Sequence, residues 1–452
     1  MTTAIGSLSA CRHVCTHHFA VPTQRSLAVA LALALGASPL AGMAANLVVV
    51  TTAGDNGSSG TCNLRQAIQT IVSQSTAGTN CAFAAASADT IHFDTGVFPN
   101  GATNTITLTD ADTSALQLSD ANVTIDANAN GTVAIERSSA ASHAFGIFEG
   151  AGGTVTLRSL TIRNGFKFAD GGGIAVSYEN LTLDHCLVSG NFAVFGGGIE
   201  ADHSSLTLTH SAVSGNTGQN DGGGIRGLLS SITLTNSSVS GNTAQGNVGA
   251  GLGGGIEAIN SDVTMTGSTV DANTAGDGGA ILSHLGSVTL TNSTLSGNTA
   301  TSLTGGAIDS TADPGNSITL INSTVSANTS NYAGGGIYRV AYAGADPAIK
   351  VVNSIIAGNS ATTQFNDTNA PLTADSSGNI IGGDAKLGAL ADNGGPTRTM
   401  MPSSGSPAID AVPCTNAPAT DQRGITRPQG ASCDIGAVEF VDVIFKNGFD
   451  GP

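Results

Sequence analysis

One unit of 25 to 31 residues recurs seven times between residues 166 and 360. Each copy has a glycine block that ends in isoleucine, a short threonine-rich apolar segment, and a closing asparagine. The isoleucines are Ile174, Ile199, Ile225, Ile256, Ile281, Ile308 and Ile337. The asparagines are Asn191, Asn216, Asn242, Asn273, Asn298, Asn328 and Asn359. A nearly fixed period of this size is typical of a solenoid, in which each coil buries its apolar face against its neighbours.

The segments inside each unit alternate with a period of two, as in Leu181-Thr182-Leu183, which predicts short strands with one face inward. Thr, Ser, Asn and Gly dominate the rest, and these residues disfavour helices. Three strands and three turns fit one coil. The sequence therefore predicts an all-β fold, a single-stranded parallel β-helix of the pectate-lyase type. The crossover rule for parallel strands makes it right-handed.

Two polar ladders are expected to run along the stack. The closing asparagines are predicted to adopt a left-handed turn and to bond amide to amide between coils. A second register runs through the residues His185, His210, Asn236, Gly267, Asn292, Asn322 and Asn353. Its two histidines are interpreted as polar turn residues rather than metal ligands, because the sequence offers no third ligand. Cys186 lies in the serine position of the same turn and is expected to be a buried free thiol.

The first 44 residues contain two arginines, no acidic residue and an apolar run from Leu27 to Leu35. This pattern predicts a secretory signal peptide, cleaved between Ala44 and Ala45. The apolar run is too short to span a bilayer, and no later segment is expected to span one either. Five cysteines follow the leader. The local pairs Cys62–Cys81 and Cys414–Cys433 are predicted disulfides, which leaves Cys186 unpaired.

Residues 45–165 are expected to form an N-terminal cap and irregular opening coils. A capping helix is predicted from Asn63, with Gln66 three residues later. Its apolar face would comprise Leu64, Ala67, Ile68, Ile71 and Val72. Such a helix would cover the end of the β-helix, where exposed strand edges invite unwanted pairing.

Residues 361–440 depart from the repeat and resemble a known family. The motifs Asp392–Thr397, Gly405–Asp410, Asp421–Gly424 and Cys433–Glu439 are similar to the choice-of-anchor Q domain of bacterial surface proteins. Thr61–Ile68 resembles the Cys-Ser-Leu-Arg-Glu-Ala motif of the same proteins, with Asn63 and Gln66 as departures. The glycine blocks resemble repeats of polymorphic outer-membrane proteins. The resemblance implies an exported protein, extracellular or on the outer surface of a Gram-negative cell. Residues 441–452 would be a tail, either a sorting signal or a frayed end.

A row of charged residues suggests a possible active site. Arg226 follows its glycine-block isoleucine directly, and Glu200 and Glu257 hold the same position in the adjacent coils. One interpretation is a lyase-like base between acidic residues, with Ca²⁺ as a cofactor. The other is a salt-bridge ladder on a solvated face, which we favour because exposed ion pairs are common. Outside the lyase alternative no cofactor is expected.

Aromatic residues, which are few in this chain, gather in adjacent coils as Phe166, Phe168, Phe192 and Phe195. They suggest a binding edge, but we favour the other interpretation, an aromatic stack that covers a coil edge. The net charge of −17 argues against nucleic-acid binding. The sequence thus favours a monomeric, structural or adhesive surface protein, with a polysaccharide or protein as its ligand. The alternative is a cation-dependent polysaccharide lyase or a glycoside hydrolase.

Overall fold

The computed structural model describes residues 45–55, 60–86, 89–109, 114–246, 251–342 and 344–441. The predicted signal peptide and nearly all of the predicted tail lie outside these residues. The described fold begins with a strand at Ala45, the residue that follows the predicted cleavage position. No helix among the described residues is long and apolar enough to cross a membrane.

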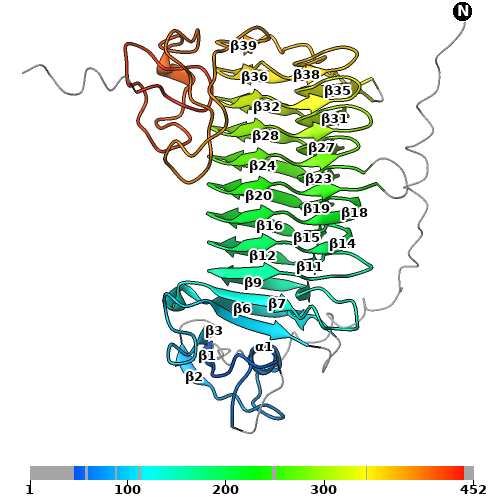
Figure 1. Ribbon diagram of the computed structural model, residues 1–452, viewed down its shortest axis with the longest axis vertical. Helices are drawn as coiled ribbons and strands as arrows, with labels where there is room; N and C mark the ends of the chain where they lie inside the picture. Colours follow the sequence, from blue (N-terminus) through cyan, green and yellow to red (C-terminus); the bar gives the residue numbers. More distant parts are fainter. Residues whose placement is uncertain are drawn as a thin grey trace, which may run out of the picture.

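The chain winds as a right-handed parallel β-helix whose coils stack along one long axis (Figure 1). The described strands form four sheets, which we call A, B, C and D. Each full coil runs through sheets C, A, B and D in that order. The sequence predicted three strands per coil. The fourth sheet is formed where the segment between the closing asparagine and the glycine block was expected to be a turn.

Sheets A and B run along most of the stack. Sheet A contains, in spatial order, β2 (Ala84–Ala86), β1 (Ala45–Val50), β3 (Thr90–Phe93), β6 (Ala121–Asp126), β9 (Gly153–Arg158), β12 (Asn180–Asp184), β16 (Ser205–Thr209), β20 (Ser231–Thr235), β24 (Asp262–Thr266), β28 (Val288–Thr291), β32 (Ile318–Ile321) and β36 (Lys350–Val352). Sheet B contains β4 (Asn104–Leu108), β7 (Val133–Arg137), β10 (Leu160–Arg163), β13 (Leu187–Ser189), β17 (Ala212–Ser214), β21 (Ser238–Ser240), β25 (Thr269–Asp271), β29 (Thr294–Ser296), β33 (Thr324–Ser326), β37 (Ile355–Ile356) and β39 (Ile380–Ile381).

Sheets C and D complete each coil. Sheet C contains β5 (Leu116–Gln117), β8 (Phe148–Ala151), β11 (Ile174–Ser177), β15 (Ile199–Asp202), β19 (Ile225–Leu228), β23 (Ile256–Ile259), β27 (Ile281–His284), β31 (Ile308–Ala312) and β35 (Ile337–Ala341). Sheet D contains β14 (Phe192–Phe195), β18 (Thr217–Asp221), β22 (Thr243–Ala244), β26 (Thr274–Ala275), β30 (Thr299–Ala300), β34 (Thr329–Ser330) and β38 (Ser360–Ala361).

The repeat fixes the register between coils. Leu181 pairs with Leu206 and Thr182 with Thr207, so like residues stack directly over one another. The glycine-block isoleucines all point inward and are fully buried. Because the side-chain period of a strand is two, a slip of one residue would expose every inward side chain of that strand. Burial of the apolar columns therefore holds the whole stack in one register.

The predicted asparagine ladder is present. The backbone N–H and the side-chain amide of Asn191 both donate to Oδ1 of Asn216, at 3.0 and 2.9 Å. The same pair of bonds recurs from coil to coil as far as Asn328 and Asn359. The prediction of a left-handed conformation at these asparagines was wrong. The residue before each one has the positive φ instead, as Gly190 does at 62°. Five of these seven residues are glycines, which adopt that conformation without steric cost, and the other two are Ala272 and Ala327, at 54° and 61°.

The second ladder has the left-handed conformation throughout. His185, His210 and Asn236 have φ values of 54°, 47° and 50°. Cys186 follows in the serine position, and its backbone N–H donates to Ser211 Oγ at 3.0 Å. Its thiol is buried and unpaired, as predicted.

The predicted helix is α1 (Leu64–Ser73), and Asn63 and Gln66 form the expected capping box. The helix lies at the N-terminal end of the stack, beneath the first coils (Figure 1). Leu64, Ala67, Ile68 and Ile71 are buried as expected. Val72 was predicted on this face but is exposed, and Thr70 is buried in its place. The predicted disulfide Cys62–Cys81 joins the segments that flank the helix.

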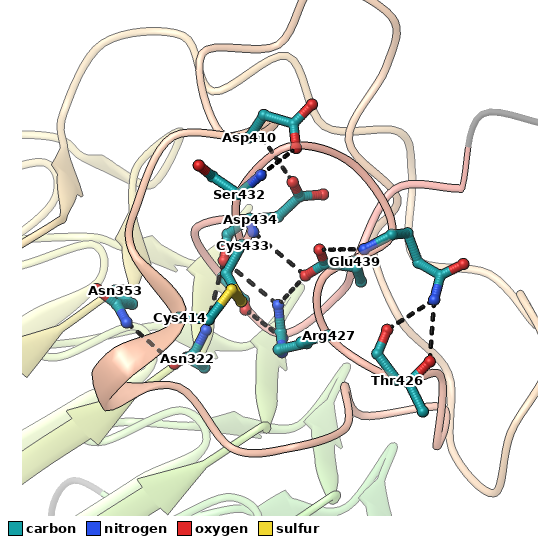
Figure 2. Close-up of a disulfide and its surroundings, with 12 residues drawn as sticks. Asn322, Asn353, Asp410, Cys414, Thr426, Arg427, Ser432, Cys433, Asp434 and Glu439 are labelled. Atoms are coloured by element: carbon teal, nitrogen blue, oxygen red, sulfur yellow. Dashed lines mark hydrogen bonds and ion pairs between the residues drawn. A yellow bond between two sulfur atoms is a disulfide. The ribbon is translucent and has the colours of Figure 1, made fainter.

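The C-terminal region folds back along the side of the stack, against sheet B of the later coils (Figure 1). The side chain of Gln422 is one of several that form this contact. Its amide nitrogen donates to Thr269 Oγ1 at 2.8 Å, and its oxygen accepts from Thr294 Oγ1 at 2.6 Å. The predicted disulfide Cys414–Cys433 lies beside the buried ion pair Arg427–Glu439, whose atoms are 2.6 Å apart (Figure 2).

Candidate functional site

The three residues proposed as a charged row lie side by side on the outer face of sheet C. In-register pairing places Arg226 on β19 between Glu200 on β15 and Glu257 on β23. Its guanidinium contacts Glu200 Oε1 at 2.8 Å and Glu257 Oε2 at 3.0 Å. The ring of Phe195 covers the guanidinium carbon at 4.7 Å from the ring centre. Only 13% of the Arg226 side chain is exposed, so this is a partly buried brace and not a solvated ladder.

Burial governs the ionisation of this brace. It raises the pKa of Glu200 to about 8 and that of Glu257 to about 8, against the opposing charge of Arg226. Burial lowers the pKa of Arg226, but Glu257, Glu200, Asp170 and Asp221 together raise it above the usual value. The guanidinium therefore keeps its proton. A general base must lose its proton at working pH, so this environment opposes the role of a lyase base for Arg226.

A second carboxylate cluster on the same face was not foreseen from the sequence. Asp277 Oδ1 accepts from Thr304 Oγ1 at 3.0 Å, and the same hydroxyl contacts Asp309. Burial and the neighbouring Asp277 hold the pKa of Asp309 well above its usual value. The two residues occupy different positions in adjacent coils. Equivalent positions of the repeat do not bring these two residues together, so the repeat pattern does not reveal the pair.

The four candidate phenylalanines separate into two groups. Phe166 stacks on Phe192 with ring centres 4.9 Å apart, and Phe168 meets Phe166 edge to face, also at 4.9 Å. Phe195 lies apart from this cluster, over Arg226. Phe168 is 68% exposed, whereas the other two rings of the cluster are half-buried. The cluster of Phe166, Phe168 and Phe192 therefore covers a coil edge and leaves the ring of Phe168 exposed to solvent.

Another exposed aromatic lies across sheet C from this cluster. Tyr178 follows β11 directly, is 66% exposed, and stacks on His203 with ring centres 4.7 Å apart. Phe168 precedes β11 by a few residues, so Phe168 and Tyr178 flank this strand along the chain. Between them the outer side chains are the small, half-buried Ala175 and Ser177. The sequence analysis did not connect Tyr178 with the phenylalanines, although all belong to the same coil.

No three carboxylates converge closely enough to hold a metal ion within the part of the chain that the structure describes. The single group of three potential ligands in that part is Asp184, His185 and His210. These residues lie at the corner between sheets A and B, away from sheet C. Two acidic residues of sheet C, Glu200 and Glu257, contact Arg226 instead.

These features define the chain as a right-handed parallel β-helix with an acidic, arginine-braced outer face and an aromatic edge. No family model and no curated protein matches its sequence. Among solved structures, it is similar to a chain described as "Crystal structure of pectate lyase Pel9A". The TM-score is 0.52 and the identity is 15%, over 88% of this chain and 97% of that one. Similarity at this level shows a shared fold.

Proposed function

We propose that this is an exported β-helix protein that binds a neutral polysaccharide across sheet C, in a structural or adhesive role. The observation that carries the proposal is the pair of exposed rings, Phe168 and Tyr178, on either side of a floor of small residues. Sugar rings pack their C–H faces against aromatic rings, and exposed aromatic groups often mark binding sites.

Acidic residues around this surface favour a neutral polysaccharide over an acidic one as the ligand. Glu149, Asp170 and Asp202 flank the floor, and the whole chain carries a net charge of −17. An acidic polymer would be repelled at this surface unless cations bridged the charges. A neutral chain of sugars meets no such barrier.

The test is affinity electrophoresis of the full chain through gels that contain neutral or uronate polysaccharides. We expect retardation by a neutral polymer, and loss of most of it in Phe168→Ser and Tyr178→Ser. Tyr342→Ser is the matched control, because Tyr342 is 59% exposed and follows β35 as Tyr178 follows β11, in a distant coil. Retardation that survives both replacements, or that falls equally in the control, would contradict the proposal.

Export and surface attachment are part of the proposal. Two disulfides support an oxidising compartment, and the leader pattern supports secretion. The choice-of-anchor-like motifs of residues 392–439 support attachment to the cell surface. Cell fractionation of the full chain and of a variant without residues 441–452 tests this. We expect a monomer in both cases, measurable by light scattering.

The alternative function is a cation-dependent polysaccharide lyase or a glycoside hydrolase. The fold shared with a pectate lyase favours it, whereas the fixed charge of Arg226 opposes it. The discriminating assay incubates the protein with Ca²⁺ and uronate polymers, and follows both ultraviolet absorbance and reducing ends. Product formation that disappears in Arg226→Ala would replace the adhesive proposal with an enzymatic one.

A further inference from the structure

A hollow at the corner between sheets A and B holds two stacked imidazoles. His185 and His210 occupy the same turn position in adjacent coils, with ring centres 4.9 Å apart and planes 15° apart. Pro396 of the C-terminal region forms the opposite wall of the hollow, whose volume is about 220 Å³. Both histidine side chains are exposed, His185 to 61%. The site is therefore open to a small solute.

The hydrogen bonds around the two rings fix where their lone pairs lie. His185 Nδ1 contacts Asp184 Oδ1 at 2.6 Å, and an ionised carboxylate only accepts, so the hydrogen is on Nδ1. His210 Nε2 contacts the amide nitrogen of Asn236 at 3.2 Å, a group that only donates. When each ring is neutral, its lone pair is therefore on Nε2. A nitrogen in this state can bind a metal ion.

The carboxylate of Asp184 is held in place from its other side. Its Oδ2 atom contacts Arg158 Nε at 3.0 Å, in the coil before. A carboxylate that orients an imidazole in this way is a recurring support for metal-binding histidines. One atom from each of Asp184, His185 and His210 lies within 4.8 Å of the other two.

We propose that His185 and His210 bind a divalent transition-metal ion of the zinc or copper class through their Nε2 atoms, while Asp184 orients His185. Imidazole nitrogen is a favoured ligand of these ions, whereas calcium and magnesium take oxygen ligands. Water would complete the coordination from the open side of the hollow. This site is separate from sheet C, and it does not depend on the proposed polysaccharide binding.

The ligand atoms must move slightly to reach bonding distance. Ligands about 2.0–2.1 Å from a tetrahedral ion lie roughly 3.3 Å from each other. Tilting the two exposed rings toward each other closes this gap without moving the backbone, because both side chains end in the hollow. When the ion binds, the hydrogen bond from the Asn236 amide to His210 Nε2 breaks, and the lone pair of Nε2 becomes available to the ion.

The chain contains an internal comparison. His203 contacts Asp202 at 2.7 Å through Nδ1, as His185 contacts Asp184. Its stacking neighbour is Tyr178, which offers no imidazole. A single Asp–His pair is therefore present at His203, and the two-imidazole arrangement is present only at His185 and His210 among the described residues.

The experiment measures Zn²⁺ binding to the full chain by isothermal titration calorimetry, in the wild type and in variants. We expect the double variant His185→Asn/His210→Asn to bind one Zn²⁺ ion fewer per chain than the wild type. Each single replacement should lower the affinity for that ion at least about tenfold. Asparagine is the residue of this register in other coils, so the turn and its positive φ are preserved. His203→Asn should leave every binding event unchanged. Asn236→His adds a third stacked imidazole and should raise the affinity for Zn²⁺ about tenfold.

A spectroscopic readout identifies the ligands. Cu²⁺ bound to the wild type should show electron paramagnetic resonance couplings from two nitrogens, and the double variant should lose that signal. Equal Zn²⁺ binding in the wild type and the double variant would overturn the proposal. An equal loss in His203→Asn would overturn it as well. Thermal unfolding of each variant separates loss of the site from loss of the fold.

Discussion

Asp367 stands where the next asparagine of the ladder would be. Its Oδ1 accepts from the backbone N–H of Asn359 at 3.0 Å and from the Asn359 side-chain amide at 2.9 Å. An asparagine in the ladder both accepts and donates, whereas a carboxylate only accepts. The hydrogen-bonded column therefore ends at Asp367, with both donors of Asn359 satisfied.

Replacing this terminal acceptor should weaken the last coils. Asp367→Ala leaves two donors of the buried Asn359 without a partner, at a cost of about 1–3 kcal/mol. Asp367→Asn keeps the acceptor and should remain close to the wild type. Urea unfolding of the two variants measures the difference. Equal stability of Asp367→Ala and the wild type would show that the acceptor of Asp367 does not stabilise the asparagine ladder.

A buried carboxyl group should make stability depend on pH. Glu179 lies in the serine position of the corner between sheets C and A, where neither of its oxygens has a partner, and burial raises its pKa to about 7. The folded state then binds this proton more tightly than the unfolded state, so stability falls as pH rises from about 4.5 through 7. Glu179→Gln should gain on the order of 1–3 kcal/mol over the wild type at pH 8 and little at pH 4. Unfolding at several pH values checks this. A gain that is the same at both pH values would contradict it.

Removing the charge of the arginine brace should be costly. Arg226→Ala leaves Glu200 and Glu257 buried and facing each other, which should destabilise the fold by about 3–5 kcal/mol at pH 9. Both carboxyl groups have a pKa near 8, so protonation should relieve most of this cost at pH 5. Denaturant unfolding at the two pH values tests the difference. Arg226→Ala with Glu200→Gln and Glu257→Gln is the control, and its cost should not depend on pH.

Docking of the C-terminal region should depend on Gln422. Gln422→Ala removes its hydrogen bonds to Thr269, Thr294 and Thr397 at once. We expect faster hydrogen exchange in residues 397–439 and in β25 and β29, with no change in β11 or β12. Gln429→Ala is the control, since the Gln429 side chain bonds only to Thr426. If hydrogen exchange is unchanged in Gln422→Ala, contacts other than those of Gln422 hold the C-terminal region against sheet B.

The single free cysteine of the described fold should be unreactive until the protein unfolds. Burial raises the pKa of Cys186 to about 12, so almost no thiolate is present at neutral pH. A thiol reagent should label Cys186 only after denaturation, as peptide mapping can show. Labelling in the native protein would mean that the corner between sheets A and B opens.

Features that repeat could be predicted from the sequence, because a period converts sequence distance into spatial neighbours. Aligning the repeats placed Arg226 between Glu200 and Glu257, and it placed Cys186 in the serine register. Local spacing gave both disulfides. The positive φ was assigned to the closing asparagine, whereas the residue before it adopts that conformation, even where it is Ala272 or Ala327. Asparagine and glycine both tolerate a positive φ, so the residue types alone do not choose between the two positions.

Contacts that do not repeat could not be predicted. Asp277 and Asp309 meet diagonally, across two coils and two positions. Phe195 packs on Arg226 from β14, where the pairing with β18 shifts register between Ala193 and Phe195. Nothing local in residues 397–439 specifies which coils they cover, because that choice depends on the shapes of both surfaces.

Because each coil bonds to its neighbours through identical columns, length is an adjustable property of this molecule. Duplicating or deleting one whole unit would lengthen or shorten the rod by about 4.8 Å, the spacing between paired strands. The capping helix and the terminal aspartate would be unaffected, since each contacts only the coils at its own end. A gene duplication that copies one unit therefore changes the length of the rod. How far such a protein extends can evolve independently of the chemistry that any one coil presents.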